Sequence, residues 1–204
     1  MKIFKGLFLV LFLLFMSCSK ESKVKDSDLL NEIILEIEER ESYDEVEYPL
    51  GLFAREYFKK EAEYAKEQLI KLAKIDLIFL SETESISLKL LKFQLQDTID
   101  YYEFEKYLNP LLSDSGFHTN FSFMVRPFHN YEQVKDYLTK LNAIPSRVNQ
   151  FLPLLREGLE KGVSQPSVIF NGYESSYNDH IIENFEKSYF YQPFNNLPKT
   201  LTST

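Results

Sequence analysis

The sequence holds few of the residues from which compact chemical sites are usually built. Among its 204 residues there are one cysteine, no tryptophan, three histidines and six glycines. The single cysteine, Cys18, excludes a disulfide within the chain. The histidines, His118, His129 and His180, lack the i,i+4 spacing that places two imidazoles on one helical face for zinc. We therefore expect no catalytic, cofactor-binding or metal-binding residue in this chain.

Positive charge is scarce as well. Lys and Arg number 23 against 31 Asp and Glu, which gives a formal net charge of −8. Binding to nucleic acid or to an anionic lipid surface rewards clustered positive charge. The charge balance therefore argues against a nucleic-acid partner and against membrane adhesion through the protein surface.

The first residues have the order of an export signal. Lys2 and Lys5 precede an unbroken apolar run from Leu7 to Met16, which is followed by the small residue Ser17. This run is well short of the roughly 20 apolar residues that a membrane-spanning helix needs. We predict a signal peptide at residues 1–17 and an exported protein.

Cys18 directly follows this signal, in the sequence LFMSC, and resembles the lipid-modified cysteine of bacterial lipoproteins. We predict that acyl chains on Cys18 anchor the protein to a membrane of the bacterial cell envelope, so that the lipid bilayer is a partner. A plain secretory signal with an incidental cysteine is the alternative. Residues 18–27 are polar and charged, which predicts a flexible tether.

Apolar residues recur at helical spacing through much of the remaining chain. The pattern predicts helices over residues 29–37 and 52–75, from a Ser81–Glu84 capping box to Asn109–Pro110, over residues 131–141, and from Pro145 onward. No stretch alternates with a period of two. We predict an all-α fold of antiparallel long helices plus shorter ones, with one irregular or extended segment near residues 111–130.

The stretch LREGLEKGVSQP, residues 155–166, contains two of the six glycines. Gly162 suits the left-handed position that ends a helix, Lys161 favours the helix end, and Pro166 prevents continuation. Its charged neighbours exclude a helix contact within a membrane, and a phosphate loop would need a preceding strand. Gly158 lies inside the helix at a cost of about 1 kcal/mol relative to alanine, so we expect another helix to pack closely there.

Several segments resemble one known family. Residues 128–166 contain DYLTKL, then IP, then REGLEKGVSQP, and this order is similar to that of the bacterial domain-of-unknown-function 885 family. The flanking sequences YPLGL at 48–52, GFHTNF at 116–121 and YFYQPFNNLP at 189–198 follow the order of the same family.

The resemblance implies a mostly helical, exported or lipid-anchored protein grouped with zinc metallopeptidases. In complete members a histidine–glutamate motif on a C-terminal helix implies zinc binding, with the glutamate activating the attacking water. This sequence contains no HExxH. We therefore interpret residues 28–204 as the helical N-terminal part of a larger peptidase-like domain, truncated after Thr204, with zinc expected only in complete members.

Three functions remain open at this point. The chain is a scaffold region that is inactive alone, a non-enzymatic surface lipoprotein that binds a partner, or one half of a peptidase whose C-terminal half is encoded separately. A peptide substrate is expected only in a completed enzyme. If a loop of this chain lines the substrate cleft, we expect it to be Gly116, Phe117 and His118, because an aromatic residue and a histidine in an irregular segment suit contact.

Overall fold

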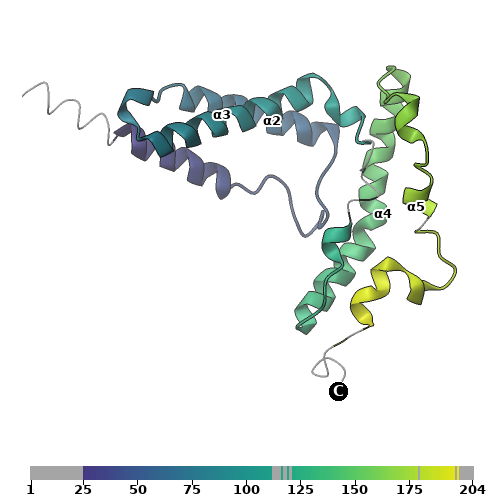
Figure 1. The fold of residues 1–204 in the computed structure, drawn as a ribbon. Coiled ribbons are helices and arrows are strands. Elements are labelled where there is room, and N and C mark those ends of the chain that lie inside the picture. Colours follow the sequence, from purple (N-terminus) through teal and green to yellow (C-terminus); the bar gives the residue numbers. More distant parts are fainter. Residues whose placement is uncertain are drawn as a thin grey trace, which may run out of the picture. The chain divides into compact units, whose positions relative to one another are not determined.

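The computed structural model describes residues 25–111, 116, 119, 121–178, 180–195 and 197 (Figure 1). Within these residues there are helices, turns and one isolated antiparallel bridge between Leu111 and Gly116, but no β-strand. The prediction of an all-α fold is confirmed. No helix in this part of the chain is long and apolar enough to cross a membrane.

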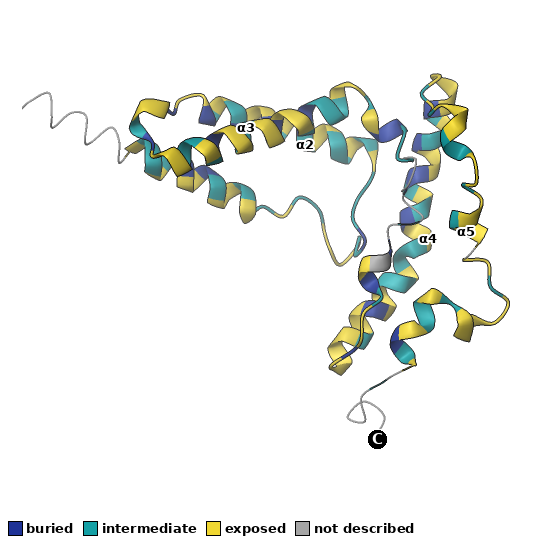
Figure 2. Cartoon of the chain, in the orientation of Figure 1, coloured by how far each residue is buried: buried dark blue, intermediate teal, exposed yellow. Residues whose placement is uncertain are grey.

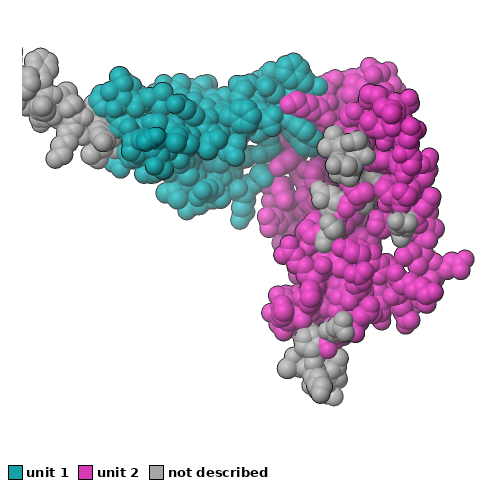
Figure 3. All heavy atoms as spheres, in the orientation of Figure 1, with its two compact units in different colours: residues 1–42, 58–104 teal, residues 43–57, 105–204 magenta. Residues whose placement is uncertain are grey.

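The chain divides into two compact units (Figure 3). Unit 1 comprises Met1–Ser42 and Phe58–Phe104, and unit 2 comprises Tyr43–Tyr57 and Glu105–Thr204. The predicted helical part, residues 28–204, therefore consists of two bodies, each with its own apolar core.

Unit 1 is built from a helix at residues 25–38, α2 (Arg55–Leu72), the 3-10 helix η1 (Leu77–Phe79) and α3 (Glu82–Glu103). The Phe58 ring near the start of α2 lies 5.3 Å from the Tyr101 ring near the end of α3, so the two helices run antiparallel, as predicted. Their shared core includes residues from all three long helices: Leu30, Ile33, Ala65, Leu72, Leu88, Leu95 and Ile99.

The helix at residues 25–38 includes residues 25–27, which were predicted to belong to the tether. Two contacts hold them on unit 1. The Asp26 carboxylate accepts a hydrogen bond from the Asp76 N–H at 3.1 Å, and the Ser27 hydroxyl donates to the Glu84 carboxylate. These long-range contacts order residues that composition alone indicated to be flexible.

The predicted capping box at the start of α3 is confirmed. The Ser81 hydroxyl accepts from the Glu84 N–H at 3.3 Å, and the Glu84 carboxylate accepts from the Ser81 N–H at 2.7 Å. The predicted end of this helix was too late. Glu105 has a left-handed backbone with φ of 51°, so α3 ends at Glu103 and the chain continues as the 3-10 helix η2 (Lys106–Leu108).

Unit 2 is organised around α4 (Tyr131–Glu160). The shorter helices are η2, η3 (Ser122–Met124), η4 (Ser167–Phe170), α5 (Ser175–Asn178), η5 (Phe185–Lys187) and η6 (Tyr189–Phe194). Its apolar core joins residues that are far apart in sequence: Leu50, Phe121, Met124, Phe128, Tyr137, Phe190 and Phe194.

The prediction of two helices within residues 131–160 was wrong, because α4 is continuous through Pro145 and Pro153. Each proline lacks an N–H and so removes one intrahelical hydrogen bond. Buried residues recur along α4 on both sides of Pro145, among them Tyr137 and Phe151 (Figure 2). This burial along the whole length holds the helix together where local sequence favours a break.

The predicted helix end at Gly162 is confirmed. Gly162 has φ of +73°, its N–H donates to the Leu159 carbonyl at 3.1 Å, and the Val163 N–H donates to the Gly158 carbonyl at 2.7 Å. This pair of bonds is the Schellman arrangement, in which a left-handed residue closes the last turn.

Candidate functional site

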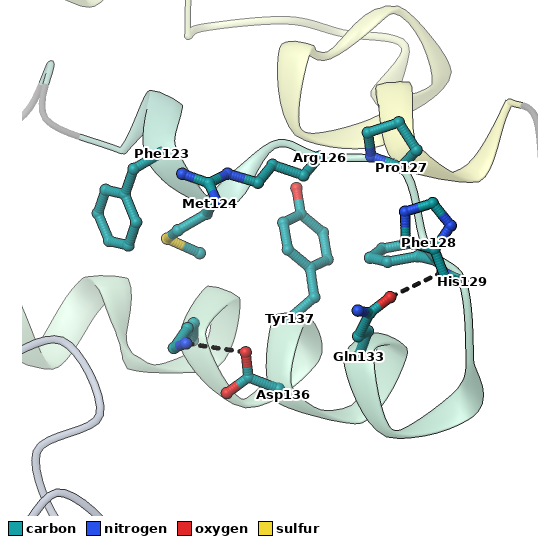
Figure 4. Close-up of a pocket in the computed structure, with 10 residues that line it drawn as sticks. Phe123, Met124, Arg126, Pro127, Phe128, His129, Gln133, Asp136 and Tyr137 are labelled. Atoms are coloured by element: carbon teal, nitrogen blue, oxygen red, sulfur yellow. Dashed lines mark hydrogen bonds and ion pairs between the residues drawn. The ribbon is translucent and has the colours of Figure 1, made fainter.

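One cavity of unit 2 lies between residues 123–129 and the first three turns of α4 (Figure 4). We call it the α4 pocket, and its volume is about 530 Å³. Small-molecule sites in proteins commonly enclose roughly 300–1,000 Å³. The α4 pocket therefore has the size of a ligand site, and all of its lining residues belong to unit 2.

The floor of the α4 pocket is apolar and fixed in place. Met124, Phe128 and Tyr137 are all buried in the core of unit 2. The Phe128 and Tyr137 rings meet edge to face with centroids 5.3 Å apart. Because these side chains are held by the core, the floor is preformed.

The Tyr137 hydroxyl is not available for acid–base chemistry. It donates to the Phe190 carbonyl at 2.7 Å, and burial, with a smaller contribution from Tyr189, raises the pKa of Tyr137 to about 12. The phenol therefore stays protonated at neutral pH and serves as a structural hydrogen-bond donor.

The rim of the α4 pocket is polar. The Lys140 ammonium pairs with the Asp136 carboxylate at 2.8 Å, one helical turn away. The Gln133 side chain accepts from the His129 N–H at 2.7 Å. Arg126 is exposed and makes no ion pair with any residue that the structure describes. Figure 4 shows its side chain extending over the pocket beside Met124 and Tyr137.

A smaller cavity of about 260 Å³ lies in unit 1 beside Arg40, Glu61 and Tyr64. The Arg40 guanidinium donates to both carboxylate oxygens of Glu61, at 2.8 and 2.6 Å, and stacks 3.9 Å above the Tyr64 ring. Its charge is already balanced, so this cavity is the weaker candidate for a charged ligand.

A second polar feature of unit 2 fixes the segment at residues 50–53 to α4. The Arg147 guanidinium is only 8 % exposed, donates to the Leu50 carbonyl at 2.8 Å, and lies among aromatic rings, the nearest being Phe53 at 4.6 Å. The Gln150 side chain accepts from the Phe53 N–H at 2.7 Å. Burial lowers the pKa of Arg147, but an arginine begins so high that it remains charged.

The residues predicted from sequence fall mostly outside the part that the structure describes. Cys18, Phe117 and His118 lie outside the described residues. Gly116 is buried, bridges to Leu111, and donates its N–H to the Thr119 hydroxyl at 3.0 Å. Gly116, at the base of the predicted cleft-lining loop, is therefore held in place by these two contacts.

Sequence reasoning missed both the α4 pocket and Arg147. One signal for Arg147 was present, since it stands one turn before Phe151 and two before Leu154, on the buried face of α4. The α4 pocket is lined by residues within 123–140, but Phe128 and Tyr137 are held in place by packing against Phe194, which no local pattern indicates. Among the described residues, no group of three or more His, Cys, Asp or Glu side chains is placed to hold a metal ion.

Comparison with known proteins covers all of unit 2 and residues 58–104 of unit 1. A family model described as "Bacterial protein of unknown function (DUF885)" matches residues 43–204. The chain belongs to the DUF885 family. Searches of curated proteins and of solved structures returned no match. The helix at residues 25–38 precedes the matched range, yet it supplies Leu30 and Ile33 to the core of unit 1.

Two segments that carry the DUF885 resemblance both make packing contacts within unit 2. The YPLGL segment is attached to α4 through Leu50 and Arg147. The REGLEKG segment forms the end of α4, where Gly158 approaches the backbone of Leu108. In this DUF885 chain both recognisable segments make packing contacts, one through the Arg147 side chain and one through the backbone of Leu108.

Proposed function

We propose that this DUF885 chain is the helical scaffold region of an exported, lipid-anchored protein that resembles zinc metallopeptidases, and that it has no hydrolytic activity alone. The observation that carries the proposal is the contact at Gly158. A Cβ at this position would lie 2.5 Å from the Leu108 carbonyl oxygen, so the glycine serves close packing. A signature segment devoted to packing supports a structural role for the region.

In this proposal the residues that bind zinc and cleave a peptide substrate belong to other polypeptide segments. The histidine–glutamate motif of the zinc metallopeptidases does not occur in these 204 residues. In a completed enzyme, whether encoded as one chain or as two halves, the loop at Gly116, Phe117 and His118 would line one wall of the substrate cleft. The bridge from Gly116 to Leu111 supports this placement by fixing the base of the loop.

Membrane association in the proposal depends on Cys18. The apolar run before it is too short to span a bilayer, whereas two or more acyl chains on one residue hold a protein stably on a membrane. The protein is then anchored to the bacterial cell envelope through lipid, and the polar residues after Cys18 separate the folded part from the bilayer surface.

A test of anchoring compares the wild-type chain with Cys18→Ser in a bacterial host. We expect the wild-type protein to incorporate a clickable fatty acid and to enter the detergent phase of a Triton X-114 separation, and the variant to do neither. Ser19→Ala is the matched control and should behave as wild type. Equal detergent partition of Cys18→Ser and wild type would refute lipid anchoring through this residue.

A test of the scaffold role incubates the purified chain with zinc and a mixed peptide library. We expect no cleavage by mass spectrometry, and cleavage that a chelator abolishes would refute the proposal. The adjacent DNA provides a second test. A downstream reading frame encoding HExxH, whose product restores chelator-sensitive cleavage when mixed with this chain, would establish the split enzyme.

A second candidate, a non-enzymatic lipoprotein that binds a partner protein, is favoured by one observation. Ile86, Leu90 and Phe93 stand at helical spacing on α3 and are 51 %, 59 % and 72 % exposed. A contiguous exposed apolar surface is typical of an interaction site. This candidate predicts that Phe93→Ser abolishes capture of one defined envelope protein, while Lys92→Ser does not.

A further inference from the structure

We propose that the α4 pocket binds a small aromatic carboxylate. The inference goes beyond the scaffold role, because it assigns a ligand to this region whether or not the chain takes part in hydrolysis. It rests on three features of the pocket: its size, its aromatic floor, and one cation without a partner among the described residues.

The floor favours an aromatic ligand body. Phe123, which is exposed, and the buried rings of Phe128 and Tyr137 line the cavity together with Met124 (Figure 4). Aromatic rings prefer edge-to-face contacts, and methionine sulfur makes favourable contacts with ring edges. Since Phe128 and Tyr137 are held by the core, binding requires little ordering of the floor.

The rim favours a single negative charge on the ligand. Lys140 is neutralised by Asp136, and the first turns of α4 offer no other cation to the pocket. Arg126 is the one lining cation that lacks an ion pair among the described residues. A guanidinium binds a planar carboxylate through two parallel hydrogen bonds, which gives both energy and orientation.

Other ligand classes fit these features less well. A phosphate dianion would face the Asp136 carboxylate with only one unpaired arginine to balance it. An uncharged aromatic molecule would leave Arg126 unused. A straight aliphatic acid satisfies Arg126 but makes poorer use of an aromatic floor. The combination therefore points to a ring that carries one carboxylate.

The test uses 2-naphthoate as the probe and the full-length chain labelled with ¹³C at methionine methyl groups. The chain has three methionines, and Met124 lines the α4 pocket. We expect the Met124 methyl signal, assigned with Met124→Leu, to shift in a saturable way as 2-naphthoate is added. Absence of a saturable shift into the millimolar range would overturn the proposal.

Two variants and two further probes isolate the charge and the ring. Arg126→Gln should weaken 2-naphthoate binding by about tenfold, the size expected for a charged hydrogen bond. Arg156→Gln, an exposed arginine on α4 outside the pocket, is the matched control and should leave affinity unchanged. The neutral amide 2-naphthamide should bind wild type and Arg126→Gln equally, and weaker than 2-naphthoate binds wild type.

Three results would contradict the assignment. Equal affinity of wild type and Arg126→Gln for 2-naphthoate would remove the carboxylate site, and tighter binding of octanoate than of 2-naphthoate would remove the aromatic preference. A Met124 signal that does not move while other resonances do would place binding elsewhere. Because Arg126 is exposed, its substitution should leave the fold intact, which circular dichroism checks.

Discussion

The Leu108 carbonyl oxygen lies 2.5 Å from the position that a Cβ would occupy at Gly158. The contact joins the backbone of α4 to the backbone of η2, fifty residues earlier in the chain. No side chain fits between them. The internal glycine, which costs helix stability on its own, therefore permits an approach that other residues would block.

We predict that Gly158→Ala destabilises unit 2. In an unobstructed helix the change would stabilise by about 1 kcal/mol, but here the added methyl meets a backbone atom that cannot rotate away. We expect the free energy of unfolding to fall by about 1–3 kcal/mol, measured by urea denaturation. Gly162→Ala is the comparison. A Cβ at Gly162 would meet no atom within 4 Å, but the backbone there has a φ of +73°. Gly162→Ala should therefore cost about 1 kcal/mol through backbone strain alone. A stabilised Gly158→Ala protein would contradict the contact.

Arg147 provides a second prediction for unit 2. Arg147→Ala removes the stem that packs against Phe53 and leaves the Leu50 carbonyl without its donor. We expect a loss of about 2–4 kcal/mol in the free energy of unfolding, from lost packing and an unsatisfied carbonyl together. Arg156→Ala, an exposed arginine on the same helix, should stay within about 0.5 kcal/mol of wild type. Equal effects of the two substitutions would show that Arg147 does not fix this segment.

The ion pairs at the end of α4 predict a dependence of stability on acid. Hydrogen bonds from Lys161 and from Arg55 lower the pKa of Glu157 below its ordinary value of 4.5. A lowered carboxyl pKa contributes stability above the unfolded value, and that contribution is lost as pH falls through the folded value. We expect stability to decline below pH 4.5 and the decline to be smaller in Glu157→Gln, measured by denaturation at several pH values. Glu160→Gln is the control, and an equally reduced decline in it would contradict the assignment.

Lys161 belongs to the same group of ion pairs and predicts that stability also depends on alkaline pH. Its hydrogen bonds to Glu105, and then to Glu157, raise the pKa of Lys161 above 10.5. A raised lysine pKa contributes stability that is fully present below the unfolded value and is lost as pH rises through the folded one. We expect Lys161→Met to flatten the loss of stability above pH 10.5, in denaturation curves recorded from neutral to alkaline pH. Unchanged curves in Lys161→Met would contradict this role.

The capping box predicts a local effect on unit 1. Ser81→Ala removes the acceptor for the Glu84 N–H at the first turn of α3 and should cost about 1 kcal/mol. Thr83→Ala, a solvent-exposed change in the same turn, should have a smaller effect in the same thermal or urea denaturation. A larger effect at Thr83 than at Ser81 would contradict the assignment of the cap.

Features governed by neighbours along the chain were predictable from sequence. The all-α class, the Ser81–Glu84 box and the Gly162 helix end depend on residues three to five positions apart, and the structure confirms each of them. The early end of α3 was missed, because a left-handed Glu105 is a rare choice for a non-glycine residue and has no sequence signal.

The α4 pocket was beyond sequence reasoning for a physical reason. Its floor depends on Tyr137 and Phe128 being buried together with residues near position 190, and nothing local indicates that contact. The i,i+4 pair of Asp136 and Lys140 is of a kind that sequence can predict, whereas the place of Arg126 beside Met124 and Tyr137 is seen only in the structure (Figure 4). The candidate site therefore emerges only from the packing of residues 123–129 on α4.

By itself the sequence determined that the chain is helical, how α3 begins at Ser81 and how α4 ends at Gly162, since these features depend on residues a few positions apart. Only the tertiary structure decided that α4 runs unbroken through Pro145 and Pro153, that Arg147 is buried against Leu50, and that Gly158 meets Leu108. Those outcomes depend on burial against distant segments, whose free energy exceeds the local preference for a break.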